Sequence, residues 1–191
     1  MKDYDIGYLL GYLCARGSIV IDEKNGNYYL CFRKPPDNVR RKIIEVYGKA
    51  SVLKREVRVY GKTIVTTTIK MVRGWNLWSV PKICFGNRDF RIGFLRGFFD
   101  ERAYIRYRER VTRNKKCRQW SIRVDDVNHR GLVGIKRLLE LEGIKSILFK
   151  VKNRWRLEID GKTWVTIFLK KVGFENKEKE AKLQQLLGLV I

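Results

Sequence analysis

The sequence has few of the residues that build metal sites and disulfide frameworks. Its 191 residues include one histidine and four cysteines, and no two cysteines form a CxxC motif. A zinc site and a disulfide scaffold are therefore not indicated, and we expect reduced thiols in an intracellular protein of the cytoplasm or nucleoid. The chain has no run of about 18 apolar residues. Its first residues also lack the pattern of a signal peptide, so no membrane association is expected.

Acidic residues are scarce relative to basic ones. Lys and Arg number 42 against 20 Asp and Glu, which gives a formal net charge of +22. A basic domain of this kind favours a polyanionic partner, and contacts of Lys and Arg with phosphate make nucleic acid the expected one. An anionic membrane surface is the rival partner, but the basic residues are spread through the chain. The charged fraction of 32% and the shortage of glutamine are typical of a thermophile.

One short pattern occurs twice in the chain. Residues 7–21 are GYLLGYLCARGSIVI and residues 93–107 are GFLRGFFDERAYIRY, and the two align without a gap. Each copy has two glycines about one helical turn apart, and these are Gly7, Gly11, Gly93 and Gly97. A glycine inside a helix costs about 1 kcal/mol relative to alanine. The repeated spacing therefore predicts two helices whose backbones approach closely at these glycines.

Strand and helix patterns follow each copy in a similar order. In the first half we expect a strand at 28–33, a helix with Asp37 as its N-cap, and strands at 51–60 and 63–72. In the second half we expect a strand at 120–124, a helix capped by Asn128, strands at 146–152 and 154–159, and helices at 163–172 and 177–187. The pattern predicts an α+β protein with two pseudo-symmetric repeats, 1–88 and 89–191, in one compact unit.

The segments YLLGYLCARGS (8–18) and FLRGFFDERAYI (94–105) resemble the two motifs of a single-chain LAGLIDADG homing endonuclease. The resemblance implies two αββαββα repeats forming a saddle, with the motif helices at a pseudo-dimer interface and a sheet surface on the DNA major groove. In that family each motif ends in an acidic residue that holds a divalent metal ion. The equivalent positions here are Arg16 and Arg102. Because arginine only donates hydrogen bonds, we expect a degenerate member with no catalytic residue, metal or cofactor, which is not an enzyme.

Basic and polar residues alternate with apolar ones along the expected strands, which places them on one face of a sheet. The candidate nucleic-acid-binding residues of the second half are Arg106, Arg108, Arg110, Gln119, Ser121, Arg123, Lys150, Lys152, Arg154 and Arg156. The first half adds Arg33, Lys54, Arg58 and Lys70, and the motif ends add Arg16 and Arg102. Arginine pairs with guanine and with phosphate. A charged face that only keeps the protein in solution is the alternative, but such faces mix both signs.

These observations predict a nuclease-dead protein that binds nucleic acid, with duplex DNA favoured and a regulatory or architectural role. We expect a monomer with internal pseudo-twofold symmetry. The resemblance also permits RNA binding, as a maturase-like splicing cofactor or a ribonucleoprotein component. A residual metal-dependent endonuclease that uses relocated acids such as Asp100 is the third alternative. The sequence leaves open whether Arg16 and Arg102 contact phosphate or form internal ion pairs.

Overall fold

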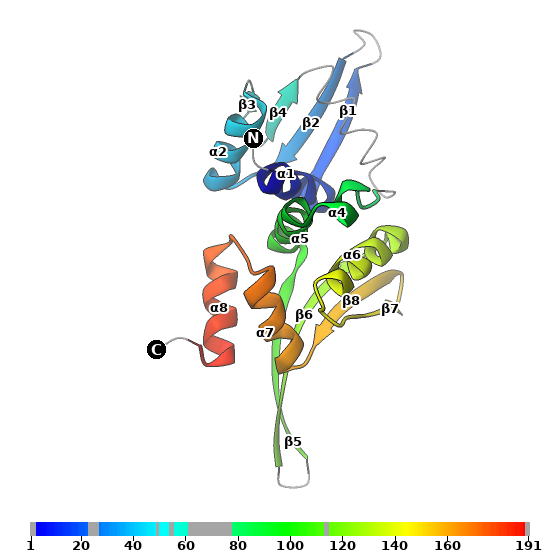
Figure 1. Cartoon of the computed structure of the whole chain (residues 1–191), viewed down its shortest axis with the longest axis vertical. Helices are drawn as coiled ribbons and strands as arrows, with labels where there is room; N and C mark the ends of the chain where they lie inside the picture. Colours follow the sequence, from blue (N-terminus) through cyan, green and yellow to red (C-terminus); the bar gives the residue numbers. More distant parts are fainter. Residues whose placement is uncertain are drawn as a thin grey trace. The chain divides into compact units, whose positions relative to one another are not determined.

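The computed structural model describes residues 3–22, 27–48, 50–53, 56–60, 78–112 and 115–189. The chain divides into two compact units, Met1–Glu101 and Arg102–Ile191. Each unit contains a four-stranded antiparallel sheet together with helices, so the predicted α+β class is confirmed (Figure 1). The first unit ends at Glu101, so it contains almost the whole of α5 (Arg88–Arg102). The predicted repeat boundary at 88 lies instead at the start of this helix. The repeats themselves stay a prediction.

The first unit begins with helix α1 and holds a sheet with the strand order β1-β2-β4-β3. Its other elements along the chain are β1 (Gly17–Asp22), β2 (Asn27–Arg33), α2 (Asp37–Tyr47), β3 (Ala50–Leu53), β4 (Glu56–Tyr60), α4 (Ile83–Gly86) and α5, and α1 spans Asp3–Arg16. Helix α2 starts at Asp37, but its N-cap is Pro36 and no side chain caps it. Asp37 therefore lies in the first turn, where its negative charge interacts favourably with the positive end of the helix dipole.

The region predicted as one strand at 51–60 forms two strands instead. Strands β3 and β4 fold back on each other, with Val52 opposite Val57 and Leu53 opposite Glu56. This reversal places β4 beside β2, where Val57 and Val59 are fully buried. Burial of these valines favours the hairpin over one continuous strand. The strand predicted at 63–72 lies outside the described residues.

Helices α1 and α5 pack with their backbones in contact inside the first unit. A Cβ atom added at Gly11 would lie 2.0 Å from the carbonyl oxygen of Phe94, and one at Gly97 would lie 2.0 Å from that of Tyr8. The corresponding distances at Gly7 and Gly93 are 2.2 and 2.1 Å, again to carbonyl oxygens of the other helix. These are the four glycines for which the sequence predicts a helix interface. No larger residue fits at any of them without moving one helix away from the other.

The second unit holds a sheet with the strand order β5-β6-β8-β7. Its elements are β5 (Tyr104–Thr112), β6 (Lys115–Asp126), α6 (His129–Leu141), β7 (Ile147–Val151), β8 (Arg154–Asp160), α7 (Lys162–Lys171) and α8 (Lys177–Leu187). The strands predicted at 146–152 and 154–159 and the helices predicted at 163–172 and 177–187 are confirmed to within one residue, while the strand predicted at 120–124 lies in the second half of the longer β6. Asn128 caps α6 as predicted, because its side chain accepts a hydrogen bond from the backbone N–H of Gly131.

One face of this second sheet is apolar and covered by helices. Ile122, Val124, Leu157 and Ile159 are fully or almost fully buried on that face, and α6 and α7 contact the strands that carry them. The opposite face carries the polar residues that alternate with them. Among the described residues, no helix combines the length and the apolar content needed to cross a bilayer.

Candidate nucleic-acid interface

The ends of α1 and α5 carry arginines that are ion-paired within their own units. Arg16 is the last residue of α1, and its Nη1 lies 2.5 Å from Oε1 of Glu101. Arg102 is the last residue of α5 and the first residue of the second unit, and its Nη2 lies 3.5 Å from Oδ2 of Asp126 in that unit. The two positions that the resemblance assigns to metal-holding acids are therefore occupied by cationic side chains beside a carboxylate.

Neither helix end offers a recognisable set of metal ligands. In the part of the chain that the structure describes, no cluster of three or more His, Cys, Asp or Glu side chains is arranged to hold an ion. Asp100 is buried and accepts a hydrogen bond of 2.7 Å from the hydroxyl of Tyr8, so it ties α5 to α1. The guanidinium groups of Arg16 and Arg102 repel cations, so the donor set does not fit a divalent metal.

The polar face of the second sheet contains three acidic residues that do not belong to the predicted surface. Cross-strand register places these residues on the same face as the candidate arginines: Asp125 on β6, and Glu158 and Asp160 on β8. The alternation that selected Arg154 and Arg156 continues through Glu158 and Asp160, so it could have found both. These carboxylates neutralise part of the face.

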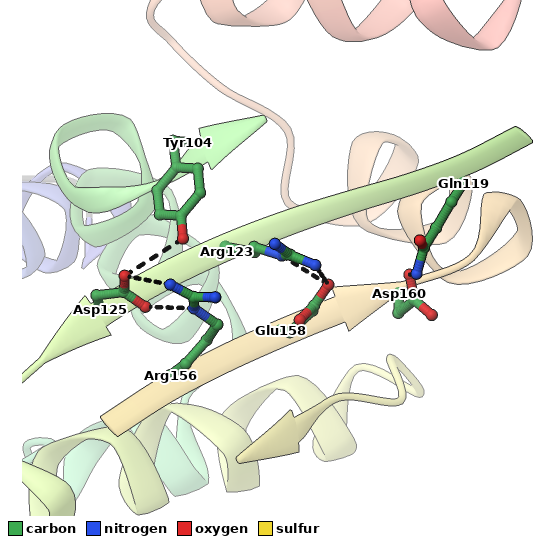
Figure 2. Close-up of polar contacts among 7 residues, drawn as sticks. All are labelled: Tyr104, Gln119, Arg123, Asp125, Arg156, Glu158 and Asp160. Carbon is green, nitrogen blue, oxygen red and sulfur yellow. Dashed lines mark hydrogen bonds and ion pairs between the residues drawn. The ribbon is translucent and has the colours of Figure 1, made fainter. Parts of the chain in front are cut away.

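Asp125 bridges two side chains on this face (Figure 2). Arg156 donates to both of its oxygens, from Nε to Oδ1 at 2.7 Å and from Nη2 to Oδ2 at 2.8 Å. The hydroxyl of Tyr104 donates to Oδ2 at 3.3 Å. The hydrogen bonds from Arg156 hold the pKa of Asp125 below its usual value, against the opposing effect of burial. Burial and the neighbouring Asp125 raise the pKa of Tyr104, so its hydroxyl stays protonated.

Arg123 and Ser121 are buried, so the prediction that they face nucleic acid is wrong. Arg123 donates from Nε to Glu158 at 2.7 Å, and only 9% and 5% of the two side chains are exposed (Figure 2). This ion pair joins the central strands β6 and β8, and both charged groups are shielded from solvent. Ser121 is 2% exposed, and its short side chain lies between Arg106 and Asp160 in the sheet register. Gln119 is exposed and donates to Asp160 at 3.1 Å.

Lys150 lies on the other face of the sheet from the one predicted. The turn at residues 152–153 pairs Lys150 with Trp155 and Phe149 with Arg156, and directly paired residues share a face. Lys152 lies in that turn, where its φ of 53° is in the left-handed region. On the polar face, strand β7 therefore presents the partly exposed apolar residues Ile147 and Phe149 in place of the predicted lysines.

Other candidates are exposed or half-buried, and they form the accessible part of the basic surface. Arg106 is half-buried and Arg108 is exposed on β5, with Arg110 farther along the same strand, and Arg154 is exposed on β8. In the first unit, Arg33 is exposed on β2 and Arg58 is half-buried on β4. Lys54 and Lys70 lie outside the described residues. The basic surface of the second unit is thus divided into arginines held by carboxylates and arginines at the β5 and β8 positions that face solvent.

Comparison with solved structures confirms the fold that the two motifs predict. The homing endonuclease I-DmoI, solved in complex with DNA and Ca, superposes with a TM-score of 0.67 at 16% identity, over 96% of this chain and 98% of that chain. The N-terminal LAGLIDADG domain of WhiA gives a TM-score of 0.56 at 16% identity, over 94% of this chain and 88% of that chain. The protein therefore has the LAGLIDADG homing endonuclease fold.

Sequence comparison gives one curated relative at low identity. No protein-family model matches the chain. The DNA-directed RNA polymerase subunit Rpo1C of Methanocaldococcus jannaschii is 24% identical over 199 residues, which cover 97% of this chain and 21% of that protein. The chain thus spans about a fifth of the length of the curated relative that it matches.

Proposed function

We propose that this protein binds duplex DNA without cleaving it, as a monomer with a regulatory or architectural role. The observation that carries the proposal is the pair of arginines, Arg16 and Arg102, at the ends of α1 and α5, each beside a carboxylate. Phosphodiester cleavage through two metal ions needs acidic ligands at a shared site. An arginine at each motif end removes such ligands and adds positive charge.

Binding is supported by charge and by fold. The formal charge of +22 supplies the counterion-release term that dominates affinity for DNA. Arg108 and Arg154 are exposed on one sheet face, where arginine can contact phosphate or guanine. I-DmoI, whose fold this chain shares, was solved in complex with DNA.

Structured RNA is the second candidate ligand, and one feature favours it. Tyr104 and Phe149 are 40% and 37% exposed on the polar face of the second sheet. Exposed aromatic rings among arginines can stack on unpaired bases, which RNA loops present and duplex DNA does not.

Crosslinking in cells, followed by sequencing of both DNA and RNA bound to the native protein, distinguishes these ligands. Enrichment of duplex genomic loci is the result that the proposal predicts. Enrichment of one structured RNA would transfer the function to splicing or ribonucleoprotein assembly. If neither ligand is enriched above the level found for an unrelated protein of equal charge, the +22 charge supports only non-specific binding, and the proposal is wrong.

A further inference from the structure

The two hydrogen bonds between Arg156 and Asp125 occupy one particular edge of the guanidinium. Nε and Nη2 both donate to the carboxylate, at 2.7 and 2.8 Å. A guanidinium has five N–H donors in a fixed plane, so three remain. Two of these, one on Nη1 and one on Nη2, lie side by side on the end edge. That edge has the geometry for two parallel hydrogen bonds to the O6 and N7 atoms of a guanine.

The surroundings of Arg156 restrict its orientation. Its side chain is 20% exposed and that of Asp125 is 26% exposed, so the pair is partly shielded from water. Tyr104 donates to Asp125 from one side, while Phe149 lies opposite Arg156 on the neighbouring strand β7. Partial exclusion of water strengthens the charge-assisted hydrogen bonds. Arg156 is thus both held in place and still reachable from solvent, unlike Arg123, which is 9% exposed.

We propose that Asp125 positions Arg156 to recognise a guanine in duplex DNA, which makes Arg156 a specificity-determining residue of this protein. The inference rests on the proposed function, because it names the base that one residue of the binding surface contacts. An arginine fixed before binding loses less side-chain entropy when it contacts a base. The exposed ring of Phe149 adds an apolar surface next to that contact, of the kind that meets a thymine methyl group.

The sheet provides a matched control cluster on its other face. Glu109 accepts hydrogen bonds from the hydroxyl of Tyr107 at 3.0 Å and from Nε of Arg118 at 2.8 Å. Glu109 is paired with Arg118 in the register, one position from Arg108, so the two clusters lie on opposite faces. Glu109→Gln and Asp125→Asn each remove one negative charge from a group of tyrosine, carboxylate and arginine. They remove the carboxylate from opposite faces of the sheet, and the control pair is the more exposed, with 59% and 46% of the Arg118 and Glu109 side chains accessible to solvent.

The test is selection of binding sites by the full chain from a randomised duplex DNA library, followed by affinity measurements on the selected site and its single-base variants. The native protein is expected to prefer guanine at one position. Asp125→Asn and Arg156→Lys are expected to weaken that preference by roughly tenfold or more. Glu109→Gln is expected to keep it. Arg156→Lys retains the positive charge, so it remains informative if melting curves show that Asp125→Asn does not fold.

The contrary results separate this inference from the proposed function. Retention of the guanine preference in either Asp125→Asn or Arg156→Lys overturns the inference. So does an equal effect of Asp125→Asn and Glu109→Gln, because both would then act only through net charge. Binding of the native protein without any guanine preference also overturns it, while the proposed function stands. Absence of salt-dependent binding by the native protein removes the proposed function itself.

Discussion

Nη1 of Arg16 lies 2.5 Å from Oε1 of Glu101, which joins the last residue of α1 to the last turn of α5. Arginine is favourable at this helix end because its charge opposes the partial negative charge of the helix C-terminus. The same guanidinium also neutralises the nearest carboxylate. The end of α1 therefore carries a cationic side chain, which repels metal ions.

Arg16→Asp is expected to create a binding site for divalent cations beside Glu101. The variant loses the ion pair with Glu101 and gains a second carboxylate near it, so it should lose up to about 1 kcal/mol of stability in the presence of a chelator. Millimolar Mg²⁺ or Ca²⁺ should restore its melting temperature, because these ions prefer carboxylate oxygens. Arg16→Asn is the control, since it removes the ion pair without adding an acid. Equal responses of the two variants to Mg²⁺ would contradict this prediction.

Gly11→Ala is expected to destabilise the first unit strongly. The new methyl group would lie 2.0 Å from the carbonyl oxygen of Phe94, so α1 and α5 would have to separate. Overpacking of this severity costs about 3 kcal/mol, more than the gain in helix propensity of about 1 kcal/mol. Gly86→Ala is the control, because nothing lies within 4 Å of its Cβ position. Chemical denaturation measures both, and equal stabilities would show that the glycines are incidental.

Arg123→Met is expected to destabilise the second unit through the partner that it leaves behind. Glu158 is 4% exposed, and loss of its arginine leaves a buried charge unpaired at a cost of about 3 to 5 kcal/mol. Adding Glu158→Leu should recover most of that loss. Arg118→Met breaks an exposed pair and should change stability by less than about 1 kcal/mol. Urea unfolding of these variants provides the test, and additive losses in the double variant would count against a coupled pair.

Asp125 is expected to contribute stability that depends on pH. Its pKa lies below the usual 3.8 because Arg156 donates to the carboxylate. The folded state therefore binds its proton more weakly than the unfolded state does. The contribution is complete above the unfolded pKa and is lost as pH falls through the lowered, folded pKa. The difference in unfolding free energy between the native protein and Asp125→Asn should be constant near neutral pH and shrink below about pH 4. A difference independent of pH would argue against the ion pair.

Arg108→Gln is expected to weaken binding to all duplex sequences alike. Arg108 is exposed on the polar face, and in the part of the chain that the structure describes it has no ion-pair partner. Loss of one phosphate contact reduces the slope of log K against log salt by about 0.9. Lys170→Gln, an equal change of charge on α7, should leave the slope nearly unchanged. Fluorescence anisotropy at a series of salt concentrations measures both slopes, and identical slopes would place Arg108 outside the interface.

The sequence predicts the fold well because its strongest signals are local. The doubled glycine spacing, the Asn128 cap and the alternation along 154–159 each depend on neighbouring residues only. The electrostatics of the polar face were predicted poorly. The pairing of Arg156 with Asp125 depends on which residues lie opposite each other across β6 and β8. The register of the hairpin at 152–153 likewise puts Lys150 on the wrong face for the predicted surface. Such pairings join distant segments, so alternation within one strand does not reveal them.

The most direct test of the central claim is a parallel measurement of binding and cleavage. The full chain is titrated against radiolabelled duplex DNA carrying its selected site, once with EDTA and once with Mg²⁺, and the DNA is then resolved on a denaturing gel. We expect binding that does not require Mg²⁺, a linear fall of log K with log salt, and DNA of full length in both conditions. Cleavage that appears only with Mg²⁺ would contradict it, because the arginines at residues 16 and 102 would then coexist with a working metal site.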